Sequence, residues 1–333
     1  MNRMPWLVLL GVLLLSVFGL GSTEAALAQP SGKTYRIGLL LPALSQAPPA
    51  PTVRAFLLSL EKLGYVEGQN LAIERRYSEE RPDRFPALAA ELIQAKVDLI
   101  VAVSTPAALA AKQATQTIPV VMIYVGDPVG TGLVASLGRP GGNLTGVSDM
   151  ATELSGKRLE LLREATTRLS RVGVLWNSAD PGMLLRAKEI QRAAQVLGVT
   201  VEPWGVQHPG EFDTVFAAMG AKPPDALFVV AEILTVTYRR RVLDFAASRR
   251  LPAMYEYGLF AREGGLMAYG PDLVGSFRRG AEYVDRVLRG TRPADLPVEQ
   301  PSQLELVVNL KTAKALGKAI GPSLLIRADE VIQ

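Results

Sequence analysis

Residues 97–115 read VDLIVAVSTPAALAAKQAT, and this stretch predicts the fold. It begins with a nearly continuous apolar run, as expected for a strand whose two faces are both covered. It ends in an Ala-rich segment that favours a helix. Only Ser104, Thr105 and Pro106 separate the two segments. A buried strand that passes through a short turn into a helix is typical of an α/β protein with a parallel sheet.

The same succession of elements occurs twice along the chain. YRIGLLLP at 35–42 matches SRVGVLWN at 170–177, VDLIVAVS matches PDALFVVA at 224–231, and TIPVVMIY at 117–124 matches RLPAMYEY at 250–257. Each half should therefore run strand, helix, strand, helix, strand, helix, strand. Right-handed crossovers would then build one Rossmann-like, doubly wound parallel sheet in each half. Later segments predict a strand at 265–270, a helix at 272–288, and a strand and helix within 305–317.

The Gly-rich stretch GRPGGNLTGVS at 138–148 marks the expected boundary between the halves. We predict a first lobe of residues 33–148 that also takes part of residues 271–333, and a second lobe of residues 150–270. A hinge would join them. Ligands of open parallel sheets bind beyond the carboxyl ends of the strands, so two facing lobes would share one cleft. Its predicted lining is 42–51, 104–106, 127–128, 177–182, Glu232, 255–257 and 269–272.

The first 28 residues have the pattern of a secretory signal peptide. Arg3 precedes an apolar run at 7–20, and Ala26-Leu27-Ala28 offers a cleavage site before Gln29. A membrane anchor is the alternative, but a span needs about 20 apolar residues and this run is shorter. The chain has no cysteine, which excludes disulfides, thiolate metal sites and a lipid-modified N-terminal Cys. We therefore expect a soluble, exported periplasmic protein.

Composition and charge favour a globular protein that does not bind nucleic acid. Hydrophobic residues make up 48% of the chain and charged residues 20%, which excludes disorder. The pI is near 9.3, yet the net charge is only +4. The basic clusters at 239–241, 249–250 and 278–279 lie in predicted helices. Solvated helix faces explain clusters of this size better than a nucleic-acid partner does.

The chain lacks the constellations of known enzyme classes. His208 is the only histidine, and no G-x-S-x-G, H-E-x-x-H or Walker motif occurs. GTGLVASLG at 130–138 lacks the dinucleotide-binding spacing. The sequence therefore predicts no catalytic residue, no cofactor and no metal site. A hydrolase that uses carboxylates alone stays open as an alternative, although no paired acids stand out.

Three motifs carry a resemblance to a known family over nearly the whole mature chain. DPVGTGLVASLGRPGGNLTGVS at 127–148, GGLMAYGPDLVGSFRRGAEYVDRVLRG at 264–290 and LPVEQPSQLELVVNLKTAKALG at 296–317 resemble ABC transporter substrate-binding proteins of the tryptophan/tyrosine type. The resemblance implies the type I periplasmic-binding-protein fold and a monomeric receptor. It would deliver a small carboxylate ligand, such as an amino acid, to an ABC permease in the inner membrane. A sensor subunit that signals to a membrane receptor is the alternative.

The resemblance also implies a binding mode. The turn that matches STPAA would hold the ligand carboxylate, and an acid near Glu232 would hold its ammonium group. The chain departs from the aromatic-amino-acid binders at VVAEILTVTYRR, residues 229–240. Physical reasoning supports the carboxylate site, because a helix N-terminus offers free N–H groups and partial positive charge.

Ten residues are the predicted ligand contacts, and seven of them have a structural alternative. For Ser104 or Thr105 the alternative is a residue that only caps its helix, and for Glu232 it is an exposed loop acid. The sequence favours a turn for Asp127 and a helix N-cap for Asp272. Strand-end tyrosines, Tyr124 included, are more often packing residues, and for Asn177 the two interpretations stay open. The predicted contacts are Pro42, Ala43, Ser104, Thr105, Asp127, Asn177, Glu232, Tyr255, Glu256 and Tyr269.

Overall fold

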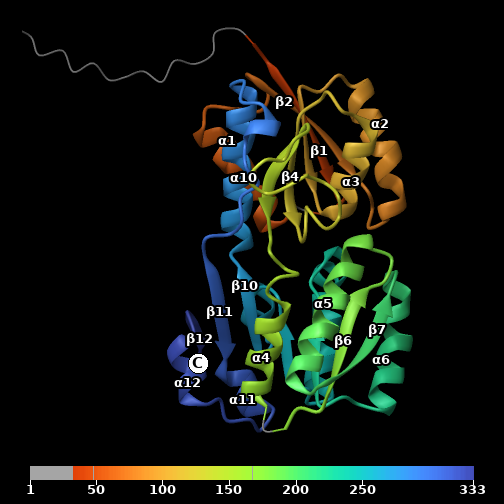
Figure 1. Cartoon of the computed structure of the whole chain (residues 1–333), viewed down its shortest axis with the longest axis vertical. Coiled ribbons are helices and arrows are strands. Elements are labelled where there is room, and N and C mark those ends of the chain that lie inside the picture. The colour runs from red at the N-terminus through yellow and green to blue at the C-terminus, as the bar shows by residue number, and fades with distance from the viewer. Residues whose placement is uncertain (1–32, 48, 167) are drawn as a thin grey trace, which may run out of the picture. The chain divides into compact units, whose positions relative to one another are not determined.

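Apolar strands alternating with amphipathic helices build two separate sheets in the computed structural model, which describes residues 33–47, 49–166 and 168–333 (Figure 1). The expected fold class, two α/β lobes, is confirmed. The predicted signal peptide lies outside the described residues. Within the described part of the chain, no helix is both long enough and apolar enough to cross a membrane.

The first lobe is built on five parallel strands in the order β2-β1-β3-β4-β5. Alternate side chains of a strand point to opposite faces. Leu39 packs with Phe56 of α1 and Phe277 of α10, whereas Leu40 packs with Leu88 of α2 on the other face. The strands are β1 (Tyr35–Leu41), β2 (Leu71–Tyr77), β3 (Leu99–Val103), β4 (Val120–Val125) and β5 (Leu144–Ser148). The helices are α1 (Pro51–Lys62), α2 (Phe85–Gln94), α3 (Thr105–Ala114) and α10 (Leu273–Leu288), with 3-10 turns at Pro82–Arg84 and Pro293–Asp295.

The second lobe is built on seven strands in the order β12-β11-β10-β9-β8-β6-β7. Five of them repeat the order of the first sheet, since β7-β6-β8-β9-β10 corresponds to β2-β1-β3-β4-β5. The strands are β6 (Arg171–Asn177), β7 (Thr200–Val206), β8 (Ala226–Val229), β9 (Ala253–Tyr255), β10 (Met267–Pro271), β11 (Leu304–Asn309) and β12 (Glu330–Ile332). The helices are α4 (Ser155–Ala165), α5 (Pro181–Leu197), α6 (Phe212–Ala221), α7 (Ile233–Thr237), α8 (Arg239–Ser248), α9 (Gly258–Arg262), α11 (Leu310–Ala315) and α12 (Pro322–Arg327), with a 3-10 turn at Pro209–Glu211.

The chain passes between the two sheets three times: after β5, after β10 and after residue 299. Helix α10 follows β10 of the second sheet but packs against the first, where Phe277 and Ala281 join the core of β1 and β3. The segment after α10 stays there, because the Ser148 amide donates to the Glu299 carbonyl at 2.9 Å. The predicted lobe limits, 33–148 and 150–270, stay predictions.

One expectation about local structure is wrong, and the last strands add an orientation on which the sequence made no prediction. Strand β11 runs antiparallel to β10, with Tyr269 opposite Leu306. The reason is the third crossover: the chain leaves β10 toward the first lobe and comes back along β11 in the opposite direction. The pair Arg249–Arg250 follows α8 instead of lying in it, and Arg250 has φ 51°.

Candidate functional site

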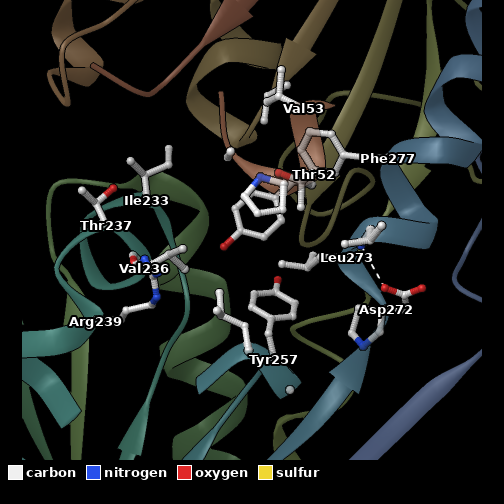
Figure 2. A pocket seen from close by; sticks show the side chains of 18 of the residues that line it. Thr52, Val53, Ile233, Val236, Thr237, Arg239, Tyr257, Asp272, Leu273 and Phe277 are labelled. Atoms are coloured by element: carbon white, nitrogen blue, oxygen red, sulfur yellow. Dashed lines mark hydrogen bonds between the residues drawn. The ribbon is translucent and has the colours of Figure 1, made fainter. Parts of the chain in front are cut away.

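A cavity of about 350 Å³ lies between the two lobes. Strand ends from both sheets line it: Pro42 follows β1, Val103 ends β3, Tyr124 lies near the end of β4, Tyr257 follows β9 and Pro271 ends β10. These are carboxyl ends of parallel strands, where open α/β sheets bind ligands. We call this space the interlobe cavity (Figure 2).

The walls of the interlobe cavity are mainly apolar, and two of their charged groups, Arg239 and Asp272, already have hydrogen-bond partners within the chain. Figure 2 shows apolar side chains from α1, α7 and α10 around the space, namely Val53, Ile233, Val236, Leu273 and Phe277. Arg239 donates from Nη2 to Glu263 at 2.8 Å. The Asp272 carboxylate accepts from the Val274 amide at 2.9 Å and caps α10, which confirms the predicted N-cap. The cavity therefore suits an uncharged apolar or aromatic group.

The turn between β3 and α3 holds a buried hydroxyl that has no partner among the described residues. Ser104 is the N-cap residue of α3, but its side chain makes no capping hydrogen bond. Its hydroxyl oxygen is buried, and the described residues offer it no hydrogen-bond partner. The capping alternative for Ser104 is therefore wrong. Thr105 is buried beside it, and a Cβ added at Gly182 in the second lobe would lie 3.2 Å from its Oγ1.

Glu232 lies in a small acidic pocket on the other side of the turn, lined also by Pro106, Asn177 and Asp180. It is only 3% exposed, so the alternative of an exposed loop acid is wrong. Its carboxylate accepts from Asn177 Nδ2 at 2.9 Å and from the Thr235 amide at 2.8 Å. Burial raises the pKa of Glu232 to about 7, despite these hydrogen bonds.

A buried network of charges lies where the chain crosses from β5 into the second lobe. Glu256 accepts from Arg158 at 2.9 Å and from Arg186 at 2.8 Å, and the Arg158 and Glu256 side chains are fully buried. Arg186 also approaches Asp149 at 3.8 Å, and the Tyr257 hydroxyl donates to Asp149 at 2.8 Å. Because Asp149 follows β5 and the other residues belong to the second lobe, the network ties the crossover to that lobe.

One hydrogen bond spans the cleft away from this crossover. Tyr238, between α7 and α8, donates to Glu80 Oε2 at 2.8 Å. Glu80 follows β2, and both Glu80 and its neighbour Glu79 have positive φ angles, 59° and 54°. Only a few per cent of non-glycine residues adopt this conformation. The bond holds the two lobes together across the mouth of the acidic pocket.

Glu80→Ala should open the lobes. A single hydrogen bond is worth about 0.5–1.5 kcal/mol, so the closed-to-open ratio should fall roughly 2- to 10-fold. Because the chain has no cysteine, Cys substitutions at exposed Leu58 and Val196 would carry unique labels for distance measurements between the lobes. Glu79→Ala is the control, since among the described residues Glu79 accepts from Ser45 of its own lobe. Equal distances in the two variants would contradict a closing role for the Glu80 bond.

Comparison with known proteins agrees with this architecture. The family model described as ABC transporter substrate binding protein matches residues 49–332. The chain belongs to this family. It is 30% identical over 263 residues to the tyrosine-binding protein of Clostridioides difficile, covering 79% of this chain and 75% of that protein.

Two solved structures are similar to this substrate-binding protein over 90% of its chain and 100% of theirs. One is an ABC domain in complex with L-Trp from Streptococcus pneumonia, with 28% identity and a TM-score of 0.82. The other is the ligand-free, open structure of a substrate-binding protein with adhesive properties from Clostridium difficile, with 27% identity and a TM-score of 0.63. At nearly equal identity, the agreement is better with the L-Trp complex. The type I periplasmic-binding-protein fold is confirmed.

Six of the ten predicted contact residues come together around the cleft of the substrate-binding protein. They are Pro42 and Ala43 on the interlobe cavity, Ser104 and Thr105 at the turn, and Asn177 and Glu232 on the acidic pocket. The turn connects the two spaces, because Val103 lines the first and Pro106 the second. Whether these residues bind a ligand stays a prediction.

The other four predicted contacts lie elsewhere in the substrate-binding protein. Asp127 accepts from the Gly130 amide at 2.7 Å, as the favoured turn interpretation expects. Tyr255 is buried and its ring stacks on Phe260 with centroids 4.8 Å apart. Glu256 belongs to the buried charge network, and the Tyr269 carbonyl accepts from Arg158 at 2.7 Å. None of the four lines the interlobe cavity in the described part of the chain.

Sequence reasoning missed the walls supplied by helices. Thr52 and Val53 begin α1, Ile233 and Val236 belong to α7, and Phe277 belongs to α10. The positions of α1 and α7 could have been used to find these residues, since each helix follows a strand whose carboxyl end was predicted to face the cleft. No signal identified Phe277, because it reaches the cavity only through the return of α10 to the first lobe.

Proposed function

We propose that this substrate-binding protein takes up an amino acid with an uncharged apolar or aromatic side chain, or a related small carboxylate. The proposal is carried by the apolar interlobe cavity, which Val103 lines, together with the next residue, Ser104, whose buried hydroxyl at the N-terminus of α3 has no partner among the described residues. A carboxylate placed there would satisfy the hydroxyl and interact favourably with the helix N-terminus. The relatives named for tyrosine and solved with L-Trp support this ligand class.

The ligand would lie with its polar groups and its side chain on different parts of the cleft. Ser104 and Thr105 hold the carboxylate, and Glu232 pairs with the ammonium group from the acidic pocket. The side chain occupies the interlobe cavity, whose volume of about 350 Å³ lies within the range of small-molecule sites. Arg239 is paired with Glu263 and Asp272 caps α10, so both groups already have partners within the chain.

Export and delivery complete the proposal. Residues 1–28 direct the chain to the periplasm and are removed. The mature protein acts as a monomer that closes around its ligand and presents both lobes to an ABC permease of the inner membrane. Membership of the ABC transporter family supports this partner.

Calorimetry with L-tryptophan, L-tyrosine and their carboxamides tests the proposal. The wild type should bind at least one of the acids and bind its amide far more weakly. Ser104→Ala should weaken binding of the acid about 10- to 100-fold, because hydrogen bonds to charged groups are worth about 1.5–3 kcal/mol. Ser248→Ala, whose hydroxyl donates to the Phe245 carbonyl away from the cleft, is the control. Equal affinity for acid and amide would refute the carboxylate site. A wild type that binds neither, and yields no carboxylate ligand by mass spectrometry after purification, would refute the ligand class.

A further inference from the structure

Tyr124 and Ser104 share two features that are rare in combination. Each has a buried hydroxyl oxygen for which the described residues supply no hydrogen-bond partner. Each also has a positive φ, 95° at Ser104 and 66° at Tyr124, although neither is glycine. Burying an unpaired hydroxyl and holding a bulky residue at positive φ both cost free energy. Such strain concentrates at ligand sites, where binding supplies the missing partner.

The two residues are neighbours at the carboxyl edge of the first sheet. Val103 pairs with Ile123 in the parallel ladder of β3 and β4, so Ser104 and Tyr124 are the next residues on each strand. The Ser104 amide donates to the Ile123 carbonyl at 3.0 Å. The register then shifts between Ile123 and Val125, so Tyr124 sits in an irregularity of β4. This irregularity changes the direction in which the Tyr124 side chain points.

The Tyr124 side chain reaches from the interlobe cavity to the buried charge network. Its ring is partly exposed on the wall of the interlobe cavity, 5.6 Å from the Tyr257 ring centroid. Its hydroxyl is buried beside the charge network that includes Asp149 and Arg186. Burial raises the pKa of Tyr124 well above its ordinary value, so the hydroxyl keeps its proton and can donate.

From these observations we propose that Tyr124 is a specificity-determining residue whose hydroxyl donates, together with that of Ser104, to the carboxylate of the bound ligand. The proposal rests on the proposed function and adds a donor from β4 to the turn of β3 and α3. The ring bounds the space for the ligand side chain while the hydroxyl binds its carboxylate. One residue thus fixes the distance between the two ligand groups. Second-lobe residues cover the turn, since α5 lies against α3 and a Cβ added at Gly182 would lie 3.2 Å from Thr105, so the ligand is enclosed when the lobes close.

Tyr124→Phe tests this proposal with the removal of one oxygen atom. Affinity for L-tryptophan or L-tyrosine, whichever the wild type binds, should fall about 10- to 100-fold, as expected for a charge-assisted hydrogen bond. Affinity for the matching carboxamide should change much less. The melting temperature of the ligand-free variant should stay equal or rise, because the lost hydroxyl had no partner.

Tyr255→Phe is the matched control. Tyr255 also has a buried hydroxyl without a partner in the described residues, but its ring lies in the core of the second lobe. This variant should keep the melting temperature and the wild-type affinity. If Tyr124→Phe binds the acid as tightly as Tyr255→Phe does, the proposal is overturned. It is also overturned if Tyr124→Phe loses acid and amide equally. A wild type that binds neither compound refutes the proposed function itself, which is a different outcome.

Discussion

Glu256→Gln should lower the free energy of unfolding by about 3–5 kcal/mol, the usual cost of removing one partner from a buried ion pair. The Glu256 carboxylate accepts from Arg158, from Arg186 and from the Ala231 amide, and its side chain is fully buried. Gln has nearly the same shape, so the substitution removes the charge and little else. Two buried guanidinium groups then lose the carboxylate that compensates them. Urea unfolding with a comparison of midpoints and slopes measures the loss.

Glu263→Gln is the control for this prediction. Glu263 also pairs with an arginine, Arg239, but the side chains of this pair are about one-third exposed. Pairs of this kind contribute about 0–1 kcal/mol. If the two variants unfold at the same urea concentration, the buried network does not hold the second lobe to the crossover in the way we infer.

Ligand affinity should rise about 100-fold between pH 5 and pH 8 if Glu232 pairs with the ligand ammonium, because a protonated carboxyl below its pKa must lose its proton before pairing. Burial raises the pKa of Glu232 to about 7 in the ligand-free protein. Below pH 7, each fall of one pH unit should weaken the ligand affinity about tenfold. The sign for stability is opposite: a raised folded-state pKa stabilises the protein at low pH, and this contribution is lost as pH rises through 7.

Calorimetry in two buffers with different ionisation enthalpies would detect the proton released on binding. Glu232→Gln should flatten the profile, and so should a ligand that keeps the carboxylate and aromatic ring but lacks the ammonium group. Asp180 is a second buried acid nearby whose pKa is raised by burial, so Asp180→Asn is the control. A profile that stays steep in Glu232→Gln and becomes flat in Asp180→Asn would assign the ammonium site to Asp180.

The sequence predicted the fold because the apolar runs that form the strands can be recognised locally and occur in the same order in both halves of the chain. Apolar runs such as LIVAV of β3 can be buried only in a sheet covered on both faces, and two halves with the same order of runs imply two such sheets. The rule that ligands bind at carboxyl ends then identified Ser104, Thr105 and Glu232 as cleft residues without any coordinates.

Tertiary structure decided which residues of a strand end face the cleft. Tyr255, Glu256 and Tyr257 are consecutive, yet they lie in the core, in the charge network and on the cavity wall respectively. β9 ends at Tyr255, so strand alternation does not set the directions of Glu256 and Tyr257, and only the packing of both sheets determines which side chain faces the cleft. The remaining site residues are positioned by partners that lie far away in the sequence. Arg158 pairs with Glu256, which lies 98 residues further along the chain. Tyr124 lies at the irregularity of β4 and lines the interlobe cavity together with Phe277 of α10, the helix that returns to the first lobe.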